Sequence, residues 1–174
     1  MQVSVMLQSK GLDVVTVARR PAPNRVAAIV EGCGGRYVST RETPLAEVAA
    51  ALPPLDLVLE ATGVGPLAFE AMSLLGSNGV LVLLSLTGGD TVAPVPVDLL
   101  NREWVLGNKV LVGSVNAAHE DFTAGVEDLE RFEARWPGLT ERLITHRLNG
   151  FADVARIAGG IDEGIKTVIE FGEG

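Results

Sequence analysis

"NGVLVLLSL", residues 78–86, begins with a turn signal and continues as an unbroken apolar run, and this stretch decides the fold. An Asn-Gly pair marks a turn, and a short apolar run without polar alternation is typical of a strand buried on both faces. Strands of that kind lie at the centre of parallel sheets whose two faces are covered by helices. We therefore predict that residues 80–86 form a central strand of a parallel α/β sheet.

The chain around this strand alternates short apolar segments with helical ones. The predicted strands cover 13–18, 37–38, 55–62, 80–86 and 109–116, and the predicted helices cover 24–33, 44–52, 66–75, 97–106 and 119–135. Asn24 is expected to be an N-cap, and Pro66 suits the first turn of a helix. Residues 3–10 fit a strand by their alternation, or a helix that ends at Gly11. Strands separated by helices of this length are typical of a doubly wound parallel sheet.

The sequence pattern changes after Pro137-Gly138. Strands are predicted at "RLITHRL" (142–148) and "KTVIEF" (166–171), with a helix at "FADVARIAGGI" (151–161) between them. We expect these segments to form a separate strand-helix-strand element.

The composition disfavours several classes of partner and site. The 174 residues carry a formal net charge of −8, which argues against a nucleic-acid or anionic-membrane partner, because phosphate binding requires a basic face. The longest apolar run is too short to span a bilayer. Cys33 is the single cysteine, which excludes an internal disulfide and fits a reducing cytoplasm. With only His119 and His146 besides, we expect no metal site in this chain.

Arg19 and Arg20 follow the predicted strand 13–18 directly. In a dinucleotide-binding sheet, an acid at this place accepts the ribose hydroxyls of NAD, whereas positive charge accommodates the 2′-phosphate of NADP. The guanidinium fork matches phosphate oxygens, and no acid occurs between Val14 and Ala22. The pair therefore indicates an NADP site, with two solvated arginines as the alternative.

Three weaker signals remain. "GVGPLA" (63–68) matches a dinucleotide fingerprint, but the following acid, Asp90, comes late and Pro66 removes an amide, so a tight strand-to-helix turn is the alternative. Asn116 ends a strand and could bind a nicotinamide amide or a polyol hydroxyl, or only end a turn. Lys166 opens the last strand and could contact a phosphate, or be solvated. No catalytic residue can be assigned, since no Ser-His-Asp or Cys-His set can be assembled.

Five stretches occur in an order and spacing shared with a known family. They are "VARRP" (17–21), "LDLVLEATG" (55–63), "NGVLVLLSL" (78–86), "NREWVLGNKVLVGSVNAAHEDF" (101–122) and "GIKTVIEF" (164–171). Together they resemble the C-terminal portion of the glucose dehydrogenases of archaea and some bacteria, in the zinc-dependent medium-chain alcohol dehydrogenase superfamily. The resemblance extends over nearly all of residues 8–171, and "EATG" and "NKVLVGSVN" are its most specific blocks.

The resemblance implies an incomplete Rossmann-like doubly wound parallel sheet in residues 1–142, followed by a strand-helix-strand tail in 143–174 that returns to the catalytic domain in the family. It implies NADP as cofactor, with NAD as a further candidate. It also implies that the "GVGPLA" match is not the phosphate-binding loop. The implied cofactor contacts are Ala18, Arg19, Arg20, Thr62, Gly63, Leu84, Ser85, Leu86, Ser114, Val115, Asn116 and Lys166. Asn116 is also implied to lie near the sugar substrate. A homo-oligomer formed through "KVLVGSVN" is a further expectation.

Several family features have no counterpart in these residues. The glycine fingerprint with its strand is missing, and so is the catalytic domain that holds the zinc ligands. We therefore expect a fragment or a late start codon, inactive by itself. The missing strand would lie between "DVVTVA" (13–18) and "DLVLEA" (56–61). We expect this gap to be closed by "MQVSVML" (1–7) as a strand, by direct pairing of the two flanks, or by another copy of the chain.

The function expected from these observations is NADP binding within a sugar 1-dehydrogenase, with glucose as the first candidate substrate. Hydride would pass from C1 of the sugar to NADP, and zinc would be held only by the missing domain. Two alternatives stay open. One is the NADP-binding part of another medium-chain polyol or alcohol dehydrogenase, and the other is a non-catalytic nucleotide-binding or assembly module.

Overall fold

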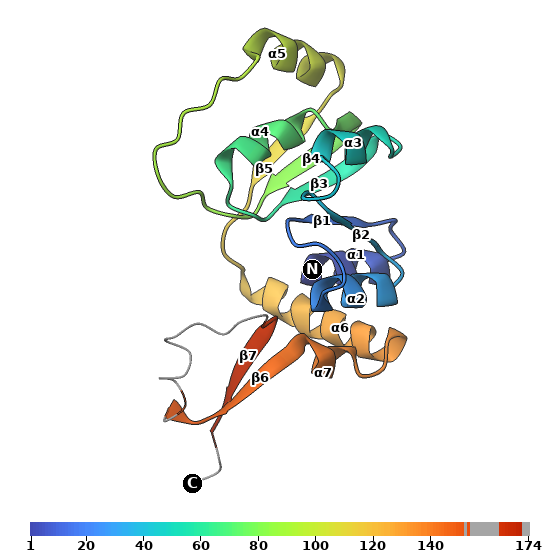
Figure 1. Ribbon diagram of the computed structural model, residues 1–174, viewed down its shortest axis with the longest axis vertical. Helices are drawn as coiled ribbons and strands as arrows, with labels where there is room; N and C mark the ends of the chain where they lie inside the picture. The colour runs from blue at the N-terminus through green and yellow to red at the C-terminus, as the bar shows by residue number, and fades with distance from the viewer. Residues whose placement is uncertain (152, 154–163, 172–174) are drawn as a thin grey trace. The chain divides into compact units, whose positions relative to one another are not determined.

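The computed structural model describes residues 1–151, 153 and 164–171. The chain forms two compact units: unit 1 is Met1–Thr43 with Ala118–Gly174, and unit 2 is Pro44–Ala117. Both are α/β and every described strand pair is parallel, as predicted (Figure 1). The expected boundary between residues 142 and 143 is not tested by this division and stays a prediction.

The described part of unit 1 contains two small sheets and four helices. Its helices are α1 (Gln2–Ser9), α2 (Arg25–Gly32), α6 (His119–Arg135) and α7 (Leu139–Leu143), and its strands are β1 (Val15–Ala18), β2 (Arg36–Ser39), β6 (Ile144–Asn149) and β7 (Lys166–Glu170). β1 pairs with β2, and β6 pairs with β7. The strands predicted in the tail are confirmed, whereas the helix predicted at 151–161 lies largely outside the described residues.

The first segment of the chain is a helix. α1 ends at Ser9 and is capped by Gly11, whose φ is +84° and whose N–H donates to the Gln8 carbonyl at 2.9 Å. The Leu12 N–H donates to the Leu7 carbonyl at 3.1 Å, which completes the usual glycine cap of a helix C-terminus. Val5 is only 1% exposed, because the helical conformation points it into the core. The expectation that residues 1–7 close the sheet as a strand is therefore wrong.

Direct pairing of the flanking strands is also wrong. Among the described strands, β1 pairs with β2 alone and β3 (Leu55–Glu60) pairs with β4 (Leu75–Leu83) alone. Each of these two strands keeps one edge without a hydrogen-bonded strand, and such edges can accept another chain. Closure by a second copy stays a prediction.

The core of unit 1 forms around α2, which buries two faces. Asn24 starts the helix, because its Oδ1 accepts the Ala27 N–H at 2.9 Å. Ala27 and Val30 pack with Tyr37 of β2 on one face. The other face packs against the helices of the unit, and this second cluster consists of Val5, Ile29, Cys33, Phe132, Leu139 and Leu143. α2 thus packs between the β1–β2 sheet and helices α6 and α7, while α1 also contacts the sheet, because Thr16 Oγ1 of β1 donates to Ser4 Oγ at 2.8 Å.

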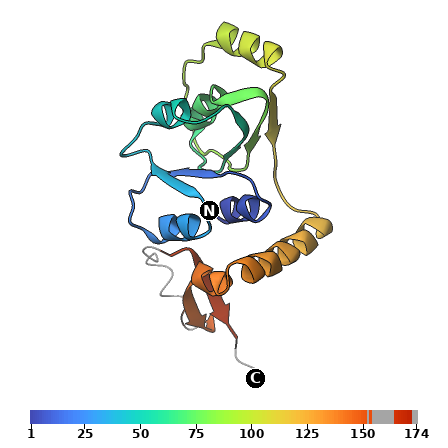
Figure 2. The same cartoon turned by 90° about the vertical axis from the view of Figure 1, so that its right-hand side faces the viewer.

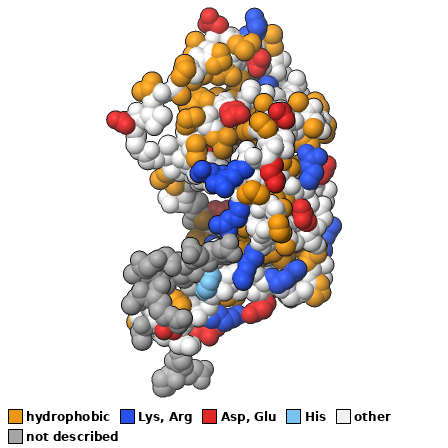
Figure 3. Space-filling view, in the orientation of Figure 1, with side chains coloured by type: hydrophobic (Ala, Val, Ile, Leu, Met, Phe, Trp, Pro, Cys, Tyr) orange, Lys and Arg blue, Asp and Glu red, His pale blue; other side chains and the backbone are white. Residues whose placement is uncertain are grey.

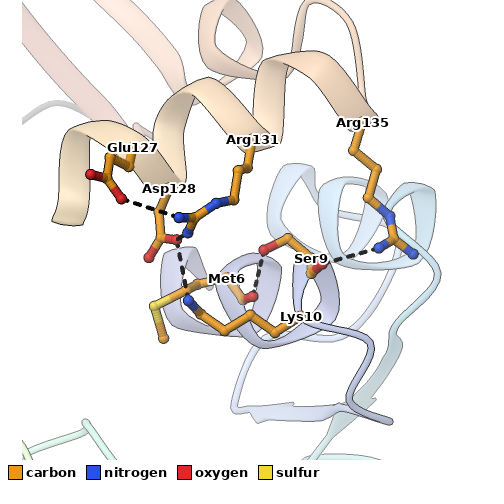
Figure 4. A network of polar contacts seen from close by, with 7 residues as sticks. All are labelled: Met6, Ser9, Lys10, Glu127, Asp128, Arg131 and Arg135. Carbon is orange, nitrogen blue, oxygen red and sulfur yellow. Dashed lines mark hydrogen bonds and ion pairs between the residues drawn. The ribbon is translucent and has the colours of Figure 1, made fainter.

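Polar contacts fasten α6 to the C-terminal turn of α1 (Figure 4). Lys10 Nζ lies 3.3 Å from Asp128 Oδ1, and Asp128 also accepts a hydrogen bond from Arg131. Arg135 Nη1 donates to the Ser9 carbonyl at 3.1 Å. Carbonyls in the last turn of a helix lack intrahelical partners, so this cation satisfies one of them.

Unit 2 is a three-stranded parallel sheet with helices. Its elements are α3 (Leu45–Ala50), β3, α4 (Gly65–Met72), β4, α5 (Val97–Leu106) and β5 (Val110–Gly113). The strand order is β3–β4–β5, so the apolar run is central as predicted (Figure 2). Leu75 was expected in the helix but begins β4, because it pairs with Leu55 and packs into the core with Ala71 and Leu81.

α7 was not predicted; it buries Leu139 and Leu143 after Gly138, whose φ is +76°. None of the helices in the described part of the chain is long and apolar enough to cross a membrane.

Replacing Leu81 by alanine should strongly destabilise the chain. Leu81 is 0% exposed in the central strand, and truncating a leucine of this kind costs about 2–5 kcal/mol. Leu86→Ala is the matched control, because Leu86 is 90% exposed and its loss should change the free energy of unfolding by less than about 0.5 kcal/mol. Urea unfolding followed by circular dichroism measures both. Equal effects of the two substitutions would contradict the central position of β4.

Candidate functional site

Three arginines meet at the carboxyl edge of the β1–β2 sheet. Arg19 and Arg20 directly follow β1, and Arg41 follows β2 after one intervening residue. Ala18 is paired with Ser39, so both chains leave the parallel sheet at the same edge. The three side chains are exposed and line a cavity of about 470 Å³, called the arginine cavity below. In the space-filling view, Lys and Arg side chains gather over the β1–β2 region (Figure 3).

The loop that carries Arg19 and Arg20 is held by its backbone carbonyls. Each of four consecutive carbonyls accepts a hydrogen bond from a neutral group of β2, its following loop or α2's cap. The bonds are Thr40 N–H to Ala18 (2.8 Å), Ser39 Oγ to Arg19 (3.0 Å), Tyr37 Oη to Arg20 (2.7 Å) and Asn24 Nδ2 to Pro21 (3.0 Å). Because the backbone is fixed in this way, both guanidinium groups start from a defined position while their side chains stay accessible.

Sequence reasoning singled out Arg19 and Arg20 but missed Arg41. The arginine pair stands out because it ends a strand, whereas Arg41 is an isolated cation in a polar stretch. Its proximity to the pair depends on the register between β1 and β2. The available signal is that Arg41 also follows a strand of a parallel sheet, at the edge where ligand-binding residues gather.

The turn after β3 is organised by Glu60, which sequence reasoning also missed. Glu60 is 6% exposed, and its Oε1 accepts both the N–H of Thr62 at 2.6 Å and its Oγ1–H at 2.5 Å. Thr62 Oγ1 in turn accepts the N–H of Val64 at 3.1 Å. The available signal was an acid at the carboxyl end of a strand that is mostly apolar. This network fixes the conformation in which Thr62 and Gly63 leave the sheet.

Gly63 lies against the loop that follows β4. Its φ is +70°, and a Cβ at this position would lie 2.9 Å from the carbonyl oxygen of Leu86. A glycine is therefore required by both the conformation and the contact. Gly65 and Pro66 begin α4, so "GVGPLA" has the geometry of a tight strand-to-helix turn.

The other residues expected at this edge follow β4 and β5. Leu84 is 40% exposed and Leu86 90% exposed, while Ser85 between them is half-buried. The residues Ser114, Val115 and Asn116 after β5 are all exposed, and Asn116 has a φ of +65°. The Leu84 N–H donates to the Glu60 carbonyl at 2.8 Å, and the Ser114 N–H donates to the Leu83 carbonyl at 3.0 Å. The three loops of unit 2 thus form one edge that could receive a ligand.

The remaining candidate residues lie elsewhere. Lys166 is exposed at the start of β7, opposite Ile144, and does not line the arginine cavity. His119 begins α6, and His146 Nδ1 lies 3.1 Å from Thr145 Oγ1. Within residues 1–151, 153 and 164–171, no three His, Cys, Asp or Glu side chains are grouped so that they could hold a metal ion.

A family model and curated relatives match this chain. The model described as "Glucose dehydrogenase C-terminus" matches residues 1–171. A glucose 1-dehydrogenase of Methanocella arvoryzae is 34% identical over 169 residues, which cover 97% of this chain and 47% of the relative. The chain therefore spans about half the length of the curated relatives that it matches.

Solved structures agree with this assignment. The Haloferax mediterranei glucose dehydrogenase in complex with NADP, Zn and gluconolactone is 31% identical with a TM-score of 0.85, covering 99% of this chain and 48% of that one. An alcohol dehydrogenase from Thermotoga maritima is 25% identical with a TM-score of 0.74, covering 97% and 46%. Both are similar to this chain along almost all of its length.

Replacing Gly63 by alanine should disturb the edge of unit 2. Gly89→Ala is a matched control, because Gly89 has a φ of +94° but open space around its Cβ position. The control should lose about 1–2 kcal/mol from backbone strain alone, and Gly63→Ala should lose at least about 1 kcal/mol more. Thermal and urea unfolding measure the difference. Equal losses would mean that the approach to Leu86 imposes no constraint.

Proposed function

This chain belongs to the glucose dehydrogenase C-terminus family, and from that premise we propose that it supplies the NADP-binding portion of a sugar 1-dehydrogenase. The proposed substrate is glucose, in line with the names of the relatives. In the proposed reaction, NADP accepts a hydride from C1 of the sugar while the C1 hydroxyl loses its proton, so that a lactone and NADPH form. The zinc ligands are proposed to lie outside these 174 residues.

The observation that carries the proposal is the arginine cavity. A 2′-phosphate bears a charge of about −1.5 to −2 at neutral pH and offers three acceptor oxygens. Arg19, Arg20 and Arg41 supply permanently charged, planar donors around one cavity, which fits such a group. NAD carries hydroxyls there instead, and these gain far less from guanidinium donors. The cavity therefore supports a preference for NADP over NAD.

The unit 2 edge is proposed to contact the rest of the cofactor. Thr62, Gly63 and the 84–86 and 114–116 segments would approach it through backbone groups, with Ala18 contributing at the adenosine end. Asn116 would contact the nicotinamide end and the sugar, because its amide can donate and accept. Lys166 would pair with a cofactor phosphate. We assign no residue of this chain a role in breaking bonds.

Charge reversal at Arg19 should remove the cofactor preference. We expect the chain to bind NADPH at least about tenfold more tightly than NADH, because charge-assisted bonds to phosphate are each worth more than about 1.4 kcal/mol. Arg19→Asp should abolish the difference by weakening NADPH alone. Arg36→Asp is the control, since Arg36 is exposed at the opposite end of β2. Nucleotide fluorescence titrations give the affinities, and equal affinities for the two cofactors in the unmodified chain would refute the NADP proposal.

The preference should also depend on pH. The second pKa of a phosphate monoester is about 6, whereas guanidinium groups stay charged throughout. As the pH falls from about 7.5 to 5, the 2′-phosphate loses its second charge and NADPH binding should weaken more than NADH binding. Titrations across this range measure the ratio. A pH-independent ratio would show that the phosphate is not held by charge.

Self-association through β5 is proposed as well. β5 is an edge strand of its sheet, and Val110, Leu111 and Val112 are 47%, 41% and 41% exposed although successive residues point to opposite faces. An exposed apolar edge of this kind pairs with another strand unless it carries charge.

A lysine on this strand should therefore dissociate the oligomer. We expect sedimentation velocity to show a dimer at micromolar concentration, and Val112→Lys to give monomers. Val92→Lys, at a loop position that is 92% exposed, should leave the dimer unchanged. A chain that is monomeric before any substitution would contradict the proposal.

A further inference from the structure

Arg41 is the member of the arginine cavity that neither the sequence pattern nor the family resemblance assigned. It is exposed beside Arg19 and Arg20, although it belongs to the loop after the neighbouring strand. Arg19 and Arg41 form no ion pair within the described residues, so no carboxylate of residues 1–151, 153 and 164–171 lies within ion-pair distance of either guanidinium group. Like charges on one cavity wall repel each other. An anion bound between them attracts both, so that the net electrostatic energy of the cluster becomes favourable.

One buried hydroxyl links the two loops. Ser39 is 2% exposed, and its Oγ donates to the Arg19 carbonyl at 3.0 Å while it accepts the Arg41 N–H at 3.2 Å. The same atom thus contacts the backbone of both cationic residues and sets their separation. A buried polar group that is satisfied on both sides holds such a spacing well, because breaking either bond leaves an unpaired group in the interior.

We propose that Arg41 is a third phosphate-binding side chain that determines the discrimination between NADP and NAD, and that Ser39 is the positioning residue that sets its distance from Arg19. This inference rests on the proposed function, since it assumes that the 2′-phosphate enters the arginine cavity. A third guanidinium group adds positive charge and further N–H donors for the three terminal oxygens of the phosphate.

The first test compares Arg41→Ala with Arg36→Ala. Both substitutions remove one exposed arginine from β2 or its following loop, but Arg36 lies at the other end of the strand and does not line the cavity. Calorimetric titrations of the full chain with NADP and NAD should show that Arg41→Ala weakens NADP about tenfold and leaves NAD unchanged. Arg36→Ala should alter both affinities by less than about twofold. The slope of log Kd against log salt concentration should also fall in Arg41→Ala alone, because one phosphate contact is lost.

The second test addresses Ser39 by a double-substitution cycle. Ser39→Ala should reduce the NADP-to-NAD affinity ratio in the unmodified chain and reduce it less in the Arg41→Ala background, because part of its effect acts through Arg41. A residue with a merely structural role would weaken both cofactors equally and additively. That result would overturn the positioning role.

The outcomes separate this inference from the proposed function. If the unmodified chain prefers NADP and Arg19→Asp removes the preference, but Arg41→Ala does not change it, only the role of Arg41 is overturned. If the unmodified chain shows no preference for NADP, both proposals fall. If Arg41→Ala lowers NADP affinity selectively, the third phosphate contact is established.

Discussion

Parallel pairing of β1 and β2 is the constraint on which the candidate site depends. In a parallel pair both chains leave the sheet at the same edge, so the residues after Ala18 and after Ser39 emerge side by side. If the same two strands formed an antiparallel hairpin, the residues after β1 would lie beside those that precede β2, and Arg41 would lie at the far end. The cluster of cations is therefore a product of topology, which local sequence does not encode.

The loop that carries Arg19 and Arg20 is held through its backbone carbonyls. A carboxylate could also hold such a loop, but it would do so by pairing with the guanidinium groups, which are proposed to bind an anion. The carbonyls of this loop are instead bound by neutral donors, among them Tyr37, Ser39 and Asn24. Each neutral hydrogen bond adds about 1 kcal/mol to the stability of the folded loop. These donors bring no negative charge near the guanidinium groups. In Arg19 and Arg20, the backbone carbonyls thus hold the loop in place, whereas ligand binding is proposed for the guanidinium groups.

The sequence predicts those features that arise from neighbouring residues. The apolar run around Leu81, the cap at Asn24 and the long helix α6 all follow from local patterns, and all are confirmed. The conformation of residues 3–10 could not be decided, because eight residues offer too few turns for the helical period to prevail over alternation. Arg41 and Glu60 were missed for a different reason. The role of each depends on a contact across a strand pair or a turn, and the order of residue types along the chain does not reveal that contact.

The "GVGPLA" motif shows why geometry must decide between a phosphate loop and a turn. A phosphate loop works by directing several backbone N–H groups at one point, and the positive end of a helix adds to their effect. Here Pro66 at the start of α4 has no N–H to give, and the N–H of Val64 is taken by the Thr62 hydroxyl. The group that faces Gly63 is the Leu86 carbonyl, an acceptor that would repel a phosphate oxygen. The glycine is thus explained by the close approach of two loops. The proposed phosphate site depends instead on the side-chain cations at the carboxyl edge of the β1–β2 sheet.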